Sequence, residues 1–286
     1  ILFLKKYRKF YFGNIKIFRK FFFAWKFLMT FLSTTKIGEN YGLTAKPYIF
    51  DYLLKENFIR KPYKKYELTL KGQQYGKVFT SSQGEQWIVW DEEKFSEILN
   101  ILKLRILKDS KINFKLYHMT HFNNLKSIIT NGFLSHNKML SLSYIDISNQ
   151  EVNNRRAHRE PYFNHFIHDY VPFYYNVRNA MLYSTQQRFG QDVIIIEVDV
   201  NACFQKQTLF TDINAATEDA MFYNCLKEFL DKADWATINS WSWFEKELIV
   251  KQRMMSECLI FDRVNSRFIK NIYTQNHLMG KQICDR

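Results

Sequence analysis

The sequence has little glycine, proline and cysteine, and its first 38 residues contain no acidic side chain. With 9 glycines and 4 prolines among 286 residues, it is neither a collagen-like nor a low-complexity chain. The four cysteines are far apart: Cys203, Cys225, Cys258 and Cys284. Because no Cys-x-x-Cys pair or metal-ligand spacing occurs, they predict reduced thiols in a cytoplasmic protein.

The composition is that of a globular chain with a basic surface. Hydrophobic residues make up 47% and charged residues 24%, so one large domain or two of ordinary size can bury a core. Aromatic residues reach 17%, and the net charge is +13. A charge of this size favours polyanionic partners, nucleic acid ahead of an anionic membrane.

Residues 1–32 predict a basic, aromatic leader. The apolar stretch 21–32 is short and interrupted by Lys26, whereas a spanning helix needs about 20 apolar residues. We therefore expect no stable membrane insertion, and no cleavage site indicates a signal peptide. The leader is either a basic amphipathic helix on nucleic acid or a membrane surface, or a disordered or artefactual extension.

Residues 33–109 predict a small separate domain. A helix begins at Ser33 and ends at Gly42, and a second helix opens with Thr44 as its N-cap. A basic turn over 61–65 and an alternating strand over 66–70 follow. This order resembles a winged helix-turn-helix domain, whose second helix enters the major groove of DNA. The alternative is a helical adaptor that binds protein.

A strand over 86–90 and an amphipathic helix from Asp91 to Asp109 connect this domain to the rest of the chain. The remaining residues, 110–286, predict a second domain of short strands and helices. Residues 116–120 form a strand on which His118 and Thr120 share a face, because positions two apart point the same way. Taken alone, His118 on such a strand is more typical of core packing than of a binding site.

Two later segments carry further polar and aromatic candidates. The polar stretch 153–161 contains Arg155, Arg156 and Arg159, and the segment 167–183 contains several tyrosines. Residues 192–199 predict a continuous buried strand, and Glu257 begins the apolar strand 257–261. A carboxylate is costly to bury unless it is paired, so a functional role is favoured for Glu257. His168 is interpreted as a cap that lies outside the site.

Together and in this order, four motifs resemble the DarT-type nucleic-acid ADP-ribosyltransferases, toxins of bacterial toxin–antitoxin and phage-defence systems. The motifs are Tyr-His-x-Thr-His, the His-Asp-Tyr-Val-Pro-Phe-Tyr block with Met-Leu-Tyr, a Phe-Thr-Asp turn and the late strand glutamate. The resemblance covers about residues 116–276. It implies an α+β, ADP-ribosyltransferase-like domain with a mixed sheet.

The implied reaction is transfer of ADP-ribose from NAD, the co-substrate, to a nucleobase of single-stranded nucleic acid, with thymine in DNA first. The resemblance makes Glu257 and Arg156 catalytic, and no metal is required. Its cofactor-binding residues are His118, Thr120, Asn124, Tyr174 and Met181. Its substrate-binding residues are Arg155, Arg159 and Tyr170. The rings of Tyr170, Tyr174 and Tyr175 would stack on nicotinamide or an unstacked base.

Several alternatives stay open at this point. The target is single-stranded DNA or RNA, and modification of a protein is a further alternative. A non-enzymatic winged-helix regulator that only binds nucleotide is another. The resemblance also implies a macrodomain antitoxin as partner. Val177 and Ala180 stand where the family commonly has prolines, which bears on the target base more than on the NAD chemistry.

Overall fold

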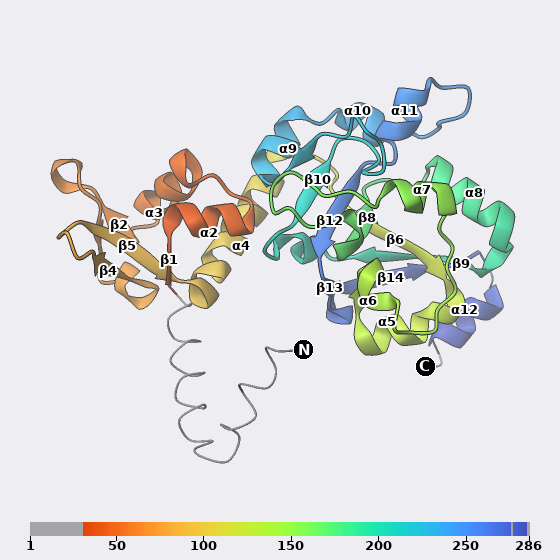
Figure 1. Cartoon of the computed structure of the whole chain (residues 1–286), viewed down its shortest axis with the longest axis horizontal. Coiled ribbons are helices and arrows are strands. Elements are labelled where there is room, and N and C mark those ends of the chain that lie inside the picture. Colours follow the sequence, from red (N-terminus) through yellow and green to blue (C-terminus); the bar gives the residue numbers. More distant parts are fainter. Residues whose placement is uncertain (1–30, 276, 285–286) are drawn as a thin grey trace, which may run out of the picture. The chain divides into compact units, whose positions relative to one another are not determined.

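The computed structural model describes residues 31–275 and 277–284, and every structural statement below concerns these residues (Figure 1). They form two compact units. The first unit contains the described residues 31–37 and 51–97, and the second contains 38–50 and 98–284. The division differs from the predicted boundary at 109, because the second half of one long helix belongs to the second unit. The predicted leader falls almost wholly outside the described residues.

The first unit is built around a small antiparallel sheet of order β1–β5–β4. Trp90 lies at its centre: the indole stacks on Phe95, and Nε1 donates a hydrogen bond to Thr34 Oγ1 at 2.8 Å. The basic turn predicted over 61–65 lies between β2 and β3. The elements from this end of the chain are β1 (Phe31–Ser33), α2 (Thr34–Tyr41), α3 (Phe50–Lys55), β2 (Ile59–Arg60), β3 (Glu67–Leu68), β4 (Gly76–Thr80), β5 (Gln86–Asp91) and α4 (Glu92–Ser110).

The predicted helices are therefore present, but the winged helix-turn-helix architecture itself stays a prediction. Gly42 ends α2 with a φ of +68°, as expected for a residue without a Cβ.

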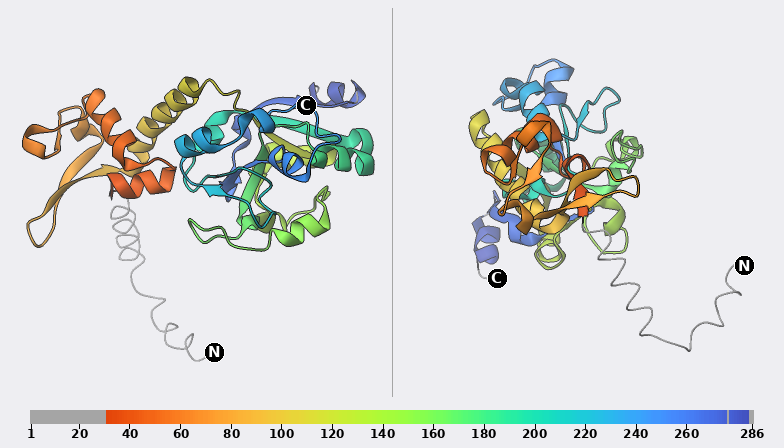
Figure 2. Two further views of the ribbon diagram at one scale, coloured as in Figure 1. Left: turned by 90° about the horizontal axis from the view of Figure 1, so that it is seen from above. Right: turned by 90° about the vertical axis from the view of Figure 1, so that its left-hand side faces the viewer.

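The second unit contains a seven-stranded sheet of order β11–β10–β12–β8–β6–β9–β14 (Figures 1 and 2). The predicted strands 116–120, 192–199 and 257–261 correspond to β6, β9 and β12, which confirms the α+β class. The prediction of a mixed sheet is wrong, because every strand pair of the described residues in this sheet is antiparallel. β8 and β9 are joined through a helix, but each pairs with β6 and not with the other, so no parallel pair forms.

The strands of the second unit, including the short β7–β13 pair, are β6 (Leu116–His121), β7 (Phe133–Leu134), β8 (Tyr170–Tyr174), β9 (Val193–Val198), β10 (Leu209–Thr211), β11 (Phe222–Tyr223), β12 (Glu257–Phe261), β13 (Arg263–Val264) and β14 (Ile269–Tyr273). Its helices are α5 (Leu125–Asn131), α6 (His136–Met139), α7 (Gln150–Arg155), α8 (Ala180–Phe189), α9 (Leu226–Lys232), α10 (Trp235–Ile238), α11 (Leu248–Arg253) and α12 (His277–Cys284). Within the described part of the chain, no helix is long and apolar enough to cross a membrane.

The core of the second unit fills the space between the sheet and its covering helices. Its central members include Phe173, Ile196, Phe229 and Cys258, all without measurable exposure. Three cysteines, Cys203, Cys225 and Cys258, are buried free thiols. The buried Lys103 of α4 donates to the Phe204 carbonyl at 3.1 Å, and burial lowers its pKa to about 8. The second half of α4 is thus tied into this core.

Candidate active site

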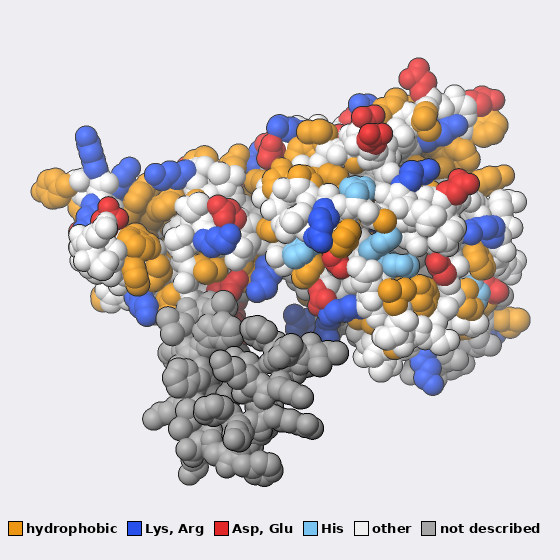
Figure 3. All heavy atoms as spheres, viewed as in Figure 1, with side chains coloured by type: hydrophobic (Ala, Val, Ile, Leu, Met, Phe, Trp, Pro, Cys, Tyr) orange, Lys and Arg blue, Asp and Glu red, His pale blue; other side chains and the backbone are white. Residues whose placement is uncertain are grey.

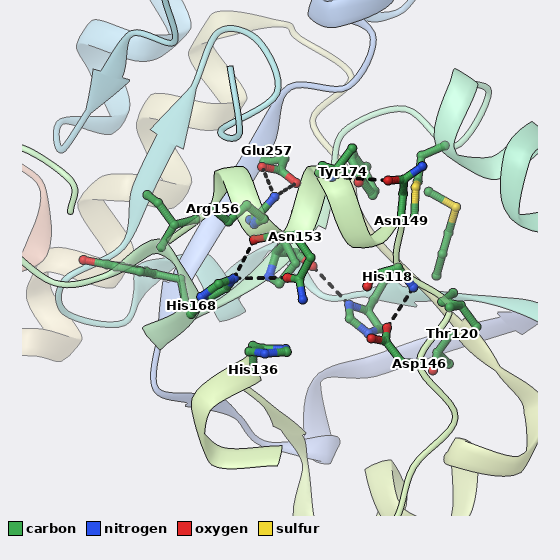
Figure 4. A pocket seen from close by; sticks show the side chains of 18 of the residues that line it. His118, Thr120, His136, Asp146, Asn149, Asn153, Arg156, His168, Tyr174 and Glu257 are labelled. Carbon is green, nitrogen blue, oxygen red and sulfur yellow. Dashed lines mark hydrogen bonds and ion pairs between the residues drawn. The ribbon is translucent and has the colours of Figure 1, made fainter. Parts of the chain in front are cut away.

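A pocket of about 440 Å³ opens in the second unit between β6, β8, α7, α8 and the segment 142–149 (Figure 4). Nine of the ten predicted site residues line it, and Arg159 does not. On one side of the pocket Arg156 is turned toward Glu257, and His118 and Thr120 lie apart from this pair. His118, Arg156 and Glu257 thus line one pocket, although they come from segments far apart in the sequence.

The strand order explains how Glu257 and Tyr174 become neighbours. β12 pairs with β8 so that Glu257 lies directly opposite Tyr174, and Tyr174 in turn pairs with Tyr117 of β6. Glu257 and Tyr174, on the neighbouring strands β12 and β8, both line the pocket, whereas Tyr117 does not. Antiparallel register fixes this alignment, because a one-residue slip would turn the side chains to the other face.

A buried ion pair joins the two predicted catalytic residues. Arg156 Nη1 lies 2.9 Å from Glu257 Oε1 and 3.0 Å from Oε2. The Glu257 side chain is 0% exposed and that of Arg156 is 11% exposed. The amide of Ala215 donates a further hydrogen bond to Glu257 Oε2 at 3.1 Å. These partners bind both carboxylate oxygens in a place where an unpaired charge would be very costly.

The second terminal nitrogen of Arg156 is a buried donor without a partner. Among the described residues, Nη2 finds no hydrogen-bond acceptor. Burial by itself lowers the pKa of Arg156, but the Glu257 carboxylate more than offsets this and raises the pKa above its ordinary value. A permanently charged guanidinium therefore presents one unused N–H group at the pocket wall. Buried polar groups of this kind are rare unless a ligand or water satisfies them.

His118 is held in one tautomer by the neighbouring strand. Its Nδ1 lies 3.0 Å from the carbonyl oxygen of Pro172, which can only accept, so Nδ1 carries the proton. Nε2 is then the acceptor of a neutral ring. Burial lowers the pKa of His118 and outweighs the opposing effect of the Pro172 bond. The ring thus offers a hydrogen-bond acceptor to a ligand at neutral pH.

Asn124 has a different task from the one predicted. Its Nδ2 donates to the Ile145 carbonyl at 2.9 Å and to Thr120 Oγ1 at 3.1 Å, and its Oδ1 accepts from the Ile145 amide at 2.9 Å. Arg188 donates to the carbonyls of Ile147 and Ser148 in the same segment. Asn124 therefore fixes the pocket wall through the backbone of residues 145–148, and its amide is already occupied.

Tyr174 and Met181 lie where the prediction places them, at the pocket wall. Burial raises the pKa of Tyr174, the Glu257 carboxylate raises it further, and Arg156 acts in the opposite direction. The phenol therefore stays protonated and can donate. Met181 stands in the first turn of α8, which Asn179 caps by accepting from the Leu182 amide at 3.0 Å.

Three of the predicted aromatic or basic residues are already engaged with other groups of the protein. Tyr170 lines the pocket but is 1% exposed, and its hydroxyl donates to Glu160 at 3.1 Å. Tyr175 is also buried, and its hydroxyl donates to the Glu257 carbonyl at 3.0 Å. Arg159 stacks on Phe166, 4.0 Å from the ring centroid, and does not line the pocket. Arg155 lines the pocket and is exposed.

His168 and His136 are pocket residues that the sequence interpretation did not include. His168 Nε2 lies 3.0 Å from the Asn153 carbonyl and 3.1 Å from its Oδ1, and the two histidine rings are 4.6 Å apart (Figure 4). Burial, followed by His136, lowers the pKa of His168. His168 belongs to the His-Asp-Tyr block already singled out, so its position next to Tyr170 was a usable signal. His136 stands in no motif.

No group of three or more metal-ligating side chains occurs in the described ranges 31–275 and 277–284. The pocket combines one buried carboxylate, a guanidinium, imidazoles and a phenol. Such a set suits the breaking of a glycosidic bond, in which positive charge develops on the ribose.

The sequence of the same region matches a known family. A model of the family described as ssDNA thymidine ADP-ribosyltransferase, DarT, matches residues 117–285, which is more than half of the chain. The chain belongs to the DarT family. The match contains the polar pocket residues and leaves the first unit outside.

Individual relatives agree with this family. The chain is 31% identical over 181 residues to a DNA ADP-ribosyl transferase of Thermus sp. (strain 2.9), covering 59% of this chain and 84% of the relative. It is 27% identical over 173 residues to a DNA ADP-ribosyl transferase–DNA ADP-ribosyl glycohydrolase fusion protein of Thermosipho africanus (strain H17ap60334). That alignment covers 59% of this chain and 44% of the fusion protein.

Solved structures of DarT proteins have the same fold. Thermus sp. 2.9 DarT in complex with ADP-ribosylated ssDNA matches with a TM-score of 0.55 and 25% identity, covering 60% of this chain and 86% of that one. The same protein in complex with carba-NAD+ matches with a TM-score of 0.51 and 24% identity, covering 60% and 87%. As a DarT member, the chain is an NAD-dependent ADP-ribosyltransferase that acts on single-stranded DNA, with NAD as its co-substrate.

Proposed function

We propose that this chain transfers ADP-ribose from NAD to thymine in single-stranded DNA, with Glu257 and Arg156 at the reacting centre. The observation that supports it is the buried Arg156–Glu257 pair, which holds a charged carboxylate at the pocket while Arg156 Nη2 has no partner among the described residues. A fixed anion beside an unused donor suits a reaction that develops positive charge on a sugar and transfers a proton from an acceptor.

The proposed reaction exchanges one bond at the ribose anomeric carbon for another. The bond from C1′ to the nicotinamide nitrogen breaks, and its electron pair leaves with nicotinamide. A ring nitrogen of thymine supplies the electron pair of the new bond to C1′, and its proton is released. Glu257, held by Arg156 Nη1 and the Ala215 amide, stabilises the oxocarbenium-like ribose between these events.

The opposite part of the pocket would position the nicotinamide end of NAD. His118 offers a neutral Nε2 as acceptor, because its Nδ1–H is bound to the Pro172 carbonyl. Thr120 lies two positions further along β6 and contributes its hydroxyl to the same pocket. The Tyr174 phenol, beside Glu257, adds a donor and an aromatic face. Stacking on such a ring contributes about 1–3 kcal/mol per base.

The acceptor would approach from the side of Arg156. Its unused Nη2 can bind an oxygen of the base and favour loss of the ring proton, because a guanidinium stays charged at neutral pH. The exposed Arg155 next to it would contact a phosphate of the strand. A single strand is required because a ring nitrogen held in a base pair cannot attack, and unpairing costs a few kcal/mol.

We also assign the chain a place as the toxin of a toxin–antitoxin pair. Modified thymine would block base pairing, so a cell needs an enzyme that removes ADP-ribose. A relative from Thermosipho africanus carries a DNA ADP-ribosyl glycohydrolase in the same polypeptide. The partner of this chain would then be a glycohydrolase of the macrodomain type. The region predicted over 33–109 would recruit DNA and take no part in bond breaking.

The test is to incubate the purified chain with NAD and short oligonucleotides of known composition, and to detect a mass gain of one ADP-ribose. Single-stranded DNA with thymine should react, whereas the same sequence without thymine, its duplex and its RNA counterpart should not. Glu257→Gln should lose the product and still bind NAD. Modification of RNA or protein alone, or of thymine-free DNA at an equal rate, would refute the assignment of the target.

A further inference from the structure

The sheet of the first unit has an exposed aromatic face. β4 and β5 pair so that Phe79 lies opposite Trp87, with ring centroids 4.8 Å apart. Phe79 is 45% and Trp87 is 41% exposed. Lys77 lies two positions before Phe79 and therefore on the same face, and its Nζ is 4.0 Å from the ring centroid of Phe31 in β1. We call Phe31, Lys77, Phe79 and Trp87 the outer sheet face.

The exposed part of this face lies toward the turn between β4 and β5, because Val89, two positions after Trp87 on the same face, is 6% exposed. Trp90 alternates with Trp87 and Val89 along β5, has no exposure, and stacks on Phe95. A cross-strand aromatic pair can stabilise a hairpin by itself, and that is the simplest account of Phe79 and Trp87. It does not explain why both rings keep almost half of their surface in water.

The charge around the outer sheet face indicates what would cover the rings. Residues 59–88 contain six lysines and arginines and two glutamates. One glutamate, Glu67, is already paired with Arg60 at 2.9 Å. Lys65 reaches β5 through a 3.1 Å hydrogen bond to Gln86 Oε1. Figure 3 shows hydrophobic and basic side chains next to one another on the surface of this unit.

We propose that the outer sheet face binds single-stranded DNA, the same strand that carries the target thymine, by stacking bases on Phe79 and Trp87. The proposal rests on the proposed function and names a binding surface for the substrate outside the reacting site. Exposed rings beside lysines suit an unpaired strand, because its bases have free faces and its phosphates are negative. In a duplex, by contrast, the base faces are stacked on one another.

The experiment compares the full chain with Phe79→Ala/Trp87→Ala on thymine-containing oligonucleotides of roughly 5 and 20 nucleotides, lengths that span the usual binding-site sizes. With the long oligonucleotide, KM should rise about 10- to 100-fold while kcat stays within about two-fold, since stacking adds binding and no chemistry. With the short one, and for the KM of NAD, the variant should match the parent.

Two further variants separate this effect from damage to the fold. Phe79→Leu/Trp87→Leu keeps the apolar surface but removes the aromatic faces, and it should show the same rise in KM at a parent-like melting temperature. Tyr63→Ala is the control, because Tyr63 is 102% exposed in the same unit but lies in the turn between β2 and β3. It should leave KM unchanged.

The outcomes are distinct from those that test the proposed function. If the parent modifies no DNA, the proposed function fails, whatever these variants do. If the parent modifies DNA and the double variants keep its KM for the long oligonucleotide, the outer sheet face is not a DNA site. An equal loss in Tyr63→Ala would also overturn the proposal. The proposal would also be overturned if the double variants differed from the parent in molecular mass in sedimentation but not in DNA affinity. That result would make the outer sheet face a contact between copies of the chain.

Discussion

Replacing Glu257 by glutamine should abolish transfer and destabilise the fold, and the two effects can be separated. The carboxylate is fully buried, is bound by Arg156 Nη1 through both oxygens, and accepts from the Ala215 amide. Glutamine keeps the shape and can keep the Ala215 bond, but it removes the negative charge. Loss of one well-placed electrostatic group raises a barrier by about 3–4 kcal/mol. We therefore expect kcat to fall about 100- to 1,000-fold.

The stability effect has the same origin. Removing one partner of a buried ion pair leaves an uncompensated charge and costs about 3–5 kcal/mol. For a domain of this size that loss corresponds to a melting temperature lower by roughly 6–20 °C. Glu257→Ala should be worse, because it also leaves the Ala215 amide without its acceptor. A lost product with the alanine variant alone would therefore not distinguish catalysis from unfolding.

The double variant Arg156→Met/Glu257→Gln supplies the control. It removes both charges, so its melting temperature should return toward that of the parent, while transfer stays absent. Single-turnover mass spectrometry and thermal unfolding are measured on the parent, on Glu257→Gln and on the double variant. The mechanism is refuted if Glu257→Gln, folded at the assay temperature, retains more than about a tenth of the parent kcat.

Three other predictions concern the groups around this pair. Burial lowers the pKa of His118 and His168 in the folded chain, whereas the same histidines of the unfolded chain take up protons near pH 6.5. Because the unfolded chain then binds more protons, the free energy of unfolding should decrease as the pH falls from about 6.5 toward 5.5. Melting temperatures should show this, less steeply in His118→Gln/His168→Gln, with the exposed His277→Gln as control. Asn124→Ala removes both hydrogen bonds to Ile145, each worth about 0.5–1.5 kcal/mol, and so loosens the pocket wall. Steady-state kinetics should show a several-fold higher KM for NAD. The control variant Asn131→Ala should keep the KM of the parent. Tyr170→Phe removes the hydroxyl that donates to Glu160. The free energy of unfolding, measured by chemical denaturation, should fall by about 1–2 kcal/mol, and the kinetics with DNA should stay unchanged. Weaker DNA binding at parent stability would show instead that this hydroxyl contacts the DNA.

The central strands could be predicted because their sequences are short apolar runs with clear ends. Residues 193–198 and 257–261 are such runs, and both became strands of the main sheet. Glu257 was conspicuous for the same reason: a carboxylate in an apolar strand demands a partner. What the pattern could not give was the partner, since Arg156 lies 101 positions away. Its assignment rested on the resemblance to a family.

The differences between expectation and structure have a common physical cause. Tyr170 and Tyr175 were predicted to stack on ligands because they lie in a polar aromatic segment, but each phenol hydroxyl donates to an acceptor outside this segment. Asn124 was assigned to NAD, whereas its amide binds the backbone of residue 145. The segment 142–149 has no periodic pattern, so no rule of sequence could place it at the pocket. The two units meet within α4, before the expected boundary at 109, because Lys103 joins the second half of α4 to the second core.

The contacts of the Arg156–Glu257 pair also explain how the proposed catalytic carboxylate can be buried before NAD binds. Three donor contacts, two from Arg156 Nη1 and one from the Ala215 amide, hold Glu257 before any ligand arrives. The energy of fixing the charge is therefore supplied by folding, and binding of NAD does not have to reorganise the site, which is the basis of electrostatic catalysis. The same pairing leaves Arg156 Nη2 without an acceptor among the described residues. In the proposed mechanism, one guanidinium orients the carboxylate with one nitrogen and meets the acceptor base with the other, so a single side chain would align the two halves of the transfer.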